Sequence, residues 1–181
     1  MSSEEAPEGL ARVQAFVNSV ELPDGPDALA TTASAAAWLR DQGFRPGALS
    51  GSDLRRLQDA REALRDALEA HTGEDVDERT GARLKECFGT TSLVPVVSPG
   101  GASLAPACTD GVDCFLADVS AAIVEATYRG TWERLKVCRA DSCRWAFYDR
   151  SKNGRGHWCS MRVCGTRAKA RTYRERRRVT T

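Results

Sequence analysis

Four of the seven cysteines stand in two matched pairs near the C-terminal end, and this spacing restricts the fold more than any other feature. Four residues separate Cys138 from Cys143, fifteen residues follow, and four residues separate Cys159 from Cys164. Thiolates are soft ligands, and four of them complete a tetrahedral zinc shell that leaves no coordination position open. The sequence therefore predicts one structural Zn²⁺ held by these cysteines. An iron–sulfur cluster, and cysteines that are free or disulfide-bonded, are the alternatives.

The segment that carries the pairs is too small to fold on its own core. About 45 residues bury little apolar surface, whereas a structural zinc contributes on the order of 10–16 kcal/mol to small finger peptides. Residues 144–148 are largely aromatic and should be extended, and Asn153-Gly154 is a turn signal. Because Gly165 is the only helix breaker after Ser160, a helix can run to about residue 178. These features predict a treble-clef-like zinc finger made of a hairpin and a basic helix.

Charge is distributed unevenly, although the formal net charge is only +1. Residues 134–181 carry 15 Lys+Arg and 3 Asp+Glu, a net of +12, and the first 133 residues carry 11 and 22, a net of −11. A basic module of this kind suits a polyanion, because guanidinium groups contact phosphates and can also contact guanine edges. At helical spacing, one stripe of the last helix consists of Arg167, Arg171, Arg174 and Arg178. The candidate nucleic-acid contacts are Arg150, Lys152, Arg155, Arg162, Arg167, Lys169, Arg171 and Arg174.

The first 130 residues predict a mainly helical domain. Apolar residues recur at helical spacing in five segments, which are residues 10–20, 31–43, 52–73, 82–88 and 113–128. Between the last two, short apolar runs flank Pro99-Gly100-Gly101 and predict a β-hairpin, with Pro95 on an edge strand. Gly130 marks a joint. The predicted class is therefore α+β, with a mainly helical regulatory domain at 1–130 and a nucleic-acid-binding zinc finger at 131–181.

Other features restrict the function class. No stretch reaches the roughly 18–20 apolar residues of a membrane span, and the acidic N-terminus lacks a signal-peptide pattern. We therefore expect a cytoplasmic, nucleoid-associated protein. The chain has no P-loop, dinucleotide fingerprint or Ser-His-Asp set, so we do not expect an enzyme.

The remaining cysteines and the two histidines are expected to be structural or solvent-facing. Cys87, Cys108 and Cys114 lie outside the pairs and should be buried, with a thiol switch between the last two as the alternative. His71 stands near a predicted helix end and should be exposed. His157 should be a packed imidazole or a phosphate contact, because four cysteines already complete the metal shell.

The C-terminal residues resemble the CGNR zinc-finger family, which usually follows a domain called ABATE. The similarity is carried by Cys138, Cys143, Trp145, Phe147, Asp149, Ser151, Asn153, residues 158–161 and residues 164–169. Where the name-giving motif has asparagine, this chain has Thr166. The N-terminal part is similar to ABATE at Phe16-Val17-Asn18, Ala37-Trp38-Leu39 and 59–64. The resemblance implies a candidate stress-induced transcriptional regulator that binds DNA through its finger and senses a signal or partner through its N-terminal domain.

Three hypotheses for function follow. The first is a transcriptional regulator that binds double-stranded DNA through the basic helix. The second is an RNA-binding protein in which Trp145, Tyr148 and Trp158 stack on bases. The third is a protein-interaction or redox-sensing zinc module whose basic helix is masked by the acidic N-terminal domain. That domain could also bind a small-molecule or protein effector, and a single small finger could need a homodimer for useful affinity.

Overall fold

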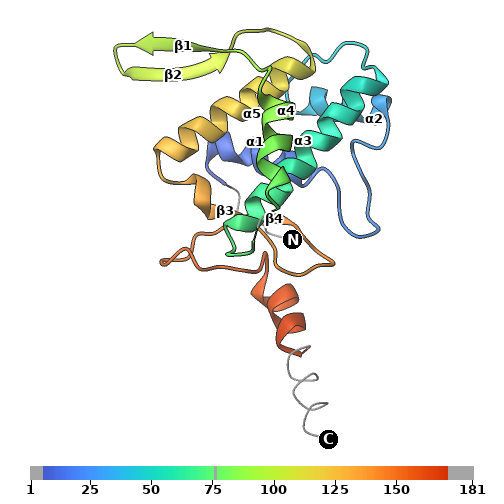
Figure 1. The fold of residues 1–181 in the computed structure, drawn as a ribbon, viewed down its shortest axis with the longest axis vertical. Coiled ribbons are helices and arrows are strands. Elements are labelled where there is room, and N and C mark those ends of the chain that lie inside the picture. Colours follow the sequence, from blue (N-terminus) through green and yellow to red (C-terminus); the bar gives the residue numbers. More distant parts are fainter. Residues whose placement is uncertain (1–5, 76, 171–181) are drawn as a thin grey trace, which may run out of the picture.

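Helices dominate the part of the chain that the structure describes, residues 6–75 and 77–170 of a computed structural model (Figure 1). The N-terminal body contains α1 (Glu8–Val17), α2 (Thr32–Asp41), α3 (Gly51–Ala70), α4 (Arg79–Phe88) and α5 (Gly111–Tyr128). Two of these helices begin at capping boxes, in which Thr31 pairs with Ser34 and Ser50 pairs with Asp53. The third helix thus starts at Ser50 rather than at Ser52, because the Ser50 hydroxyl accepts the Asp53 N–H.

Aromatic rings form the centre of the body core. Phe115 of α5 lies edge-on to Phe16, Trp38 and Phe44, with ring centroids 4.9, 5.5 and 5.2 Å away. Leucines of α3 fill the space beside this cluster and are almost completely buried. Burial of these side chains is the main favourable contribution to folding of the body.

Two antiparallel hairpins complete the described fold. The strands β1 (Leu93–Ser98) and β2 (Gly101–Pro106) pair across a two-residue turn, with Leu93 opposite Pro106 and Ser98 opposite Gly101. This hairpin extends away from the helices (Figure 1). After a short 3₁₀ turn, Trp132–Arg134, the strands β3 (Leu135–Val137) and β4 (Ala146–Tyr148) form the second hairpin. The structure thus confirms the predicted α+β class and the expectation that Pro95 lies on an edge strand.

The second hairpin belongs to the core of the body and also supports the cysteine site. Leu135, Val137, Ala146 and Tyr148 are buried in the same apolar cluster as α1, α3 and α5. Phe147 alternates to the other side of β4 and is buried against Cys138 and Cys164. One face of the hairpin therefore joins the helices and the other joins the cysteines.

The C-terminal helix points away from the body. It opens with one π-helical turn, Met161–Gly165, and continues as α-helix to residue 170, where the described structure ends (Figure 1). The predicted contacts Arg171 and Arg174, and Arg178 of the predicted stripe, lie outside the described residues. In the described part of the chain, none of the helices has the length and apolar character needed to span a bilayer.

Candidate metal centre and nucleic-acid interface

The two cysteine pairs meet in one compact cluster. The four Sγ atoms of Cys138, Cys143, Cys159 and Cys164 all lie within 4.8 Å of one another. The Sγ of Cys159 is 3.6 Å from that of Cys143 and 3.8 Å from that of Cys164. Tetrahedral zinc with bonds near 2.3 Å separates neighbouring sulfurs by about 3.8 Å. The cluster therefore fits one structural zinc with four thiolate ligands.

A tight turn at the tip of the β3–β4 hairpin positions the first pair. The N–H of Cys138 donates to the Trp145 carbonyl at 2.9 Å, and the Ala140 carbonyl accepts the N–H groups of Cys143 and Arg144. Arg144 completes the turn with φ 45°, a left-handed conformation that non-glycine residues rarely adopt. The pair thus lies at the tip of a hairpin, whereas the sequence suggested a hairpin between the two pairs.

The start of the C-terminal helix positions the second pair. Ser160 caps this helix through its hydroxyl, which accepts the Val163 N–H, so Cys159 precedes the cap and Cys164 lies in the first turn. Gly165 follows at a crowded position, where a Cβ atom would come 3.0 Å from the Met161 thioether. Zinc bound here fixes where the basic helix begins.

The protonation of the thiols supports a cation in the cluster. Hydrogen bonds from Cys143 and Cys159 hold the pKa of Cys138 far below its usual value. Hydrogen bonding to Cys138 and Cys143 raises the pKa of Cys159, and burial raises the pKa of Cys164 to about 12. Without a cation, one thiolate would suppress ionisation of its neighbours. A divalent ion removes this conflict because it stabilises all four thiolates together.

A buried ion pair holds the loop that links the two pairs. Lys136 Nζ lies 3.0 Å from Asp149 Oδ2, and both side chains are almost inaccessible to solvent. Burial alone would raise the pKa of Asp149, but hydrogen bonds from Ser151, Lys136 and the Gly156 N–H outweigh it and keep the pKa below the usual range. Asp149 thus closes the loop 149–156 on itself, and the loop brings Cys159 back to Cys138.

This loop leads to the first prediction, because Gly156 has no room for a side chain. A Cβ atom there would lie 2.9 Å from the Asp149 carboxylate. We expect Gly156→Ala to reduce the free energy of unfolding by about 1–3 kcal/mol, because the carboxylate must move away from its donors. Urea denaturation of the zinc-loaded protein measures this change. Gly51→Ala is the matched control, because a Cβ there would meet only Arg55 at 3.6 Å, and a change of equal size would contradict the crowding argument.

Polar contacts fasten the finger to the helical body. The Asn18 side chain acts as an extra strand, because its Oδ1 accepts the Ala146 N–H at 2.7 Å and its Nδ2 donates to the Ala146 carbonyl at 2.9 Å. Arg65 of α3 is fully buried and donates to the carbonyls of Val17 and Arg144. The finger is therefore held by backbone groups of its own strand and turn, and not only by side-chain packing.

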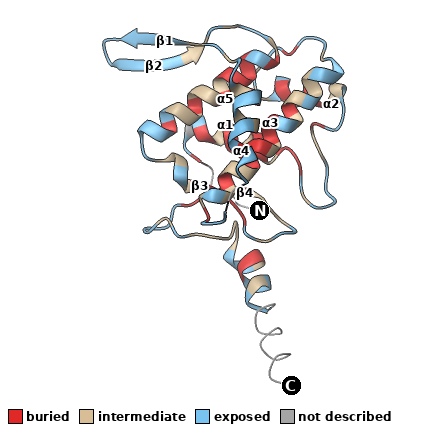
Figure 2. Ribbon diagram, viewed as in Figure 1, coloured by how far each residue is buried: buried red, intermediate tan, exposed pale blue. Residues whose placement is uncertain are grey.

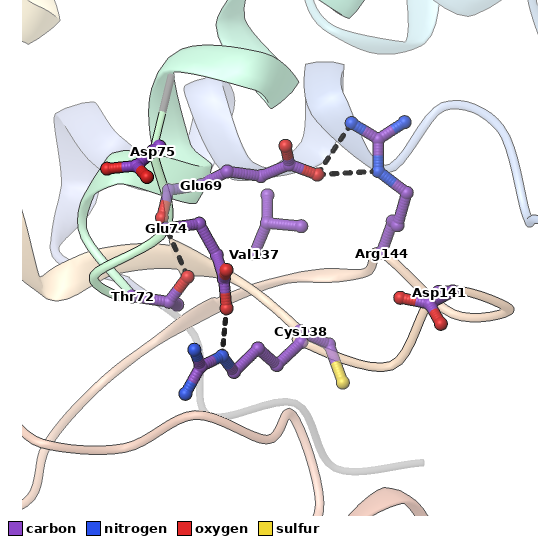
Figure 3. Close-up of a pocket in the computed structure, with 9 residues that line it drawn as sticks. Glu69, Thr72, Glu74, Asp75, Val137, Cys138, Asp141 and Arg144 are labelled. Atoms are coloured by element: carbon purple, nitrogen blue, oxygen red, sulfur yellow. Dashed lines mark hydrogen bonds and ion pairs between the residues drawn. The ribbon is translucent and has the colours of Figure 1, made fainter. Parts of the chain in front are cut away.

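Ion pairs close the solvent-exposed edge of the same junction. Figure 3 shows Glu69 reaching Arg144, with separations of 2.7 Å, and Glu74 pairing with Arg139, around a polar cavity of about 320 Å³ beside Cys138. Arg144 also pairs with Asp66 at 2.9 Å. Acidic groups at the end of α3 thus hold both sides of the first cysteine turn.

The cations of the finger divide into two groups by environment. Those before residue 150 are engaged in the fold: Arg134 donates to backbone carbonyls, Lys136 pairs with Asp149, and Arg139 and Arg144 pair with the body. Residues 150–170 contain six Lys+Arg and no Asp or Glu. All six are exposed, and they are Arg150, Lys152, Arg155, Arg162, Arg167 and Lys169.

Several other residues lie in places that the sequence did not fully indicate. His71 is half-buried rather than exposed: its Nδ1 lies 2.7 Å from the Leu135 carbonyl, and burial lowers its pKa. Cys87 and Cys114 are buried, and Cys108 is half-buried. His157 is half-buried and its Nδ1 has no hydrogen-bond partner among the described residues, as in a packed imidazole. Thr166 is exposed and donates to the Met161 carbonyl at 3.2 Å.

Comparison with protein families accounts for both parts of the chain. The model of the ABATE family, described as "Putative stress-induced transcription regulator", matches residues 10–128. The chain belongs to the ABATE family. The model of the CGNR zinc finger matches residues 134–177, which include all four clustered cysteines. This ABATE protein therefore carries a CGNR finger with one structural zinc. A search of curated proteins found no match to the chain.

Proposed function

We propose that this protein is a DNA-binding transcriptional regulator in which the zinc cluster presents a basic loop and helix to the duplex. The observation that carries the proposal is the run of exposed cations at residues 150–170, which contains no acidic residue. The family description supports regulation of transcription. No catalytic role is proposed, because a closed shell of four thiolates leaves the metal no position for a substrate.

The arrangement of the cations suits a phosphate backbone followed by a groove. Arg150, Lys152 and Arg155 lie on the loop that ends at Cys159, and Arg162, Arg167 and Lys169 lie on the helix that follows. Ten described helical residues extend about 15 Å, enough for the start of a recognition helix. Loop cations would contact phosphates and fix the register, and helix cations would face the groove.

Two observations favour duplex DNA over the alternatives. Tyr148 is buried in the body core and Trp158 packs against the cysteine cluster, so neither ring presents an open face for stacking on single-stranded bases. The described part of the basic helix extends away from the acidic body (Figure 1), which does not favour self-masking. In this proposal the helical body positions the finger and receives the signal, and the protein acts at the nucleoid.

A salt titration tests the proposal. If about five phosphates are neutralised, the logarithm of the binding constant should fall with the logarithm of salt concentration with a slope near −4.5. We expect replacement of Arg162, Arg167 and Lys169 by alanine to weaken binding and to make the slope shallower by about 2.7. Fluorescence anisotropy on a mixed duplex, from low to high salt, measures both quantities.

The matched control replaces three exposed cations of the body, Arg40, Arg45 and Arg55, by alanine. The two triple variants carry the same net charge, so only a local role of the helix predicts different slopes. Equal slopes, or a wild-type protein whose binding is insensitive to salt, would contradict DNA binding through this surface. Competition with single-stranded RNA decides against the duplex if RNA displaces it.

A further inference from the structure

Exposed apolar side chains gather on the first hairpin and on the neighbouring end of α5. Among the described residues, six large apolar side chains are exposed, and five of them belong to this region: Val94, Val96, Val97, Leu104 and Tyr128. We call these five residues the hairpin surface. Val97 and Tyr128 are 79% and 89% exposed, values that leave them almost without protein neighbours. Figure 2 shows most of the hairpin exposed, in contrast to the buried inner faces of the helices. Such a concentration marks an interaction site.

The chemistry of this region is uniform. Residues 93–106 contain no charged residue. Between the hairpin and α5 lies an open cavity of about 350 Å³, lined mainly by small and apolar side chains that include Pro95, Ala121 and Val124. A two-stranded hairpin is marginally stable in water unless one of its faces is covered. Both its sequence and its exposure therefore call for a cover that is apolar.

The strand edges restrict how a cover can bind. Ala107 donates to Ser92, and the turn lies at residues 99–100, so every second pair along the hairpin is hydrogen-bonded and the outward-facing residues include Pro95 and Pro106. Proline has no N–H, so each outer edge lacks a donor where an added strand would need one. The cover must therefore act mainly through side chains rather than by extending the sheet.

We propose that the hairpin surface packs against the same surface of a second copy of this chain. Charge supports this partner. The first 133 residues carry a net charge of −11, so most of the body repels a copy of itself, whereas the hairpin surface is neutral. Its rim carries one acid and one base, Glu125 and Arg129, with side chains 50% and 70% exposed. In a two-fold arrangement each acid of one copy can meet the base of the other, which makes the rim self-complementary.

The size of the surface sets the expected affinity. The hairpin and the five neighbouring α5 residues provide about 20 residues, the lower end of the 20–30 that a stable interface uses on each side. The dimer should therefore form in the micromolar range and be sensitive to single substitutions. This proposal does not rest on DNA binding, because it concerns the opposite end of the fold from the basic helix (Figure 1).

The mass of the full-length, zinc-loaded chain in solution tests the proposal. One chain has a mass of 19.7 kDa, and we expect light scattering to show a rise towards twice this value between about 1 and about 100 µM. Val97→Asp and Tyr128→Lys should each weaken association at least about tenfold, because each places a charge in an apolar contact. Both residues are exposed, so thermal melting should be unchanged. Ala48→Asp, at an exposed loop position of the body, is the matched control and should associate like the wild type.

A mixing experiment identifies the partner as a second copy. Glu125→Arg and Arg129→Glu should each weaken self-association, because each gives the rim two like charges, and an equimolar mixture should restore it. A wild-type chain that keeps the mass of one chain at about 100 µM would overturn the proposal. Variants of the hairpin surface that associate normally, or a mixture that stays at the mass of one chain, would also overturn it and point to a small apolar ligand or another protein.

Discussion

Loss of zinc should unfold the finger and destabilise the helical body as well. Cys138→Ser replaces a thiolate by a hydroxyl that does not ionise, and the remaining three ligands cannot close the shell. In small finger peptides the metal contributes about 10–16 kcal/mol. Here the hairpin that carries Cys138 also buries Leu135, Val137 and Tyr148 in the body core, so part of this energy stabilises the body. We expect a large drop in melting temperature and loss of tight DNA binding.

Zinc content and hydrogen exchange separate the steps of this expectation. The variant should bind less than one zinc per chain, and the amides of β3 and β4 and then those of α1 should lose protection. Cys108→Ser is the control, because Cys108 is half-buried and lies outside the cluster. It should keep one zinc and normal protection. A Cys138→Ser protein with a full zinc complement would contradict the assigned ligands, and one with an intact α1 would contradict the shared core.

The spacing of residues along the chain predicted the local features of this structure. Two matched cysteine pairs indicated the zinc cluster, because the tetrahedral shell requires close pairs on tight turns. Apolar periodicity indicated the helices, and a proline–glycine turn between short apolar runs indicated the first hairpin. These features depend on neighbours within a few residues, which is why they can be derived from the sequence.

The joint between finger and body could not be derived in this way. Asn18 meets Ala146 across 128 positions, and Arg65 meets Arg144 across 79. Nothing local to either partner indicates such a contact. Sequence reasoning treated the finger as a module that folds on its metal alone, whereas β3 and β4 complete the apolar core of the helices. An isolated signal existed in Lys136, which stands between two apolar strand residues and is buried on Asp149.

The same limit applies to the charged residues. Arg139 and Arg144 look like any other cation of the basic segment, yet acids at the end of α3 neutralise both. The cations of residues 150–170 remain exposed because the loop and helix that carry them extend beyond the reach of those acids. Only the fold separates cations that hold the finger in place from cations that are exposed for a polyanion.

The buried guanidinium of Arg65 should be the most sensitive point of the joint. It donates to the carbonyls of Val17 and Arg144 and lies 3.1 Å from the Glu62 carboxylate, with no exposed surface of its own. Arg65→Ala leaves two buried carbonyls without donors and a carboxylate without its partner. We expect a loss of about 3–5 kcal/mol in the free energy of unfolding. Arg65→Lys should recover only part of it, because an ammonium group cannot reach three acceptors in the planar geometry of a guanidinium.

Urea denaturation of the zinc-loaded variants measures this loss, and Arg83→Ala provides the matched control. Arg83 is also an arginine paired with an acid of α3, Asp66, but 40% of its side chain is exposed. An exposed pair contributes about 0–1 kcal/mol, so the two alanine variants should differ severalfold. Because Arg65 joins α1 and α3 to the turn after Cys143, its loss should also expose the β3–β4 amides to exchange while zinc remains bound. Equal effects of the two substitutions would show that the finger is held by its apolar core alone.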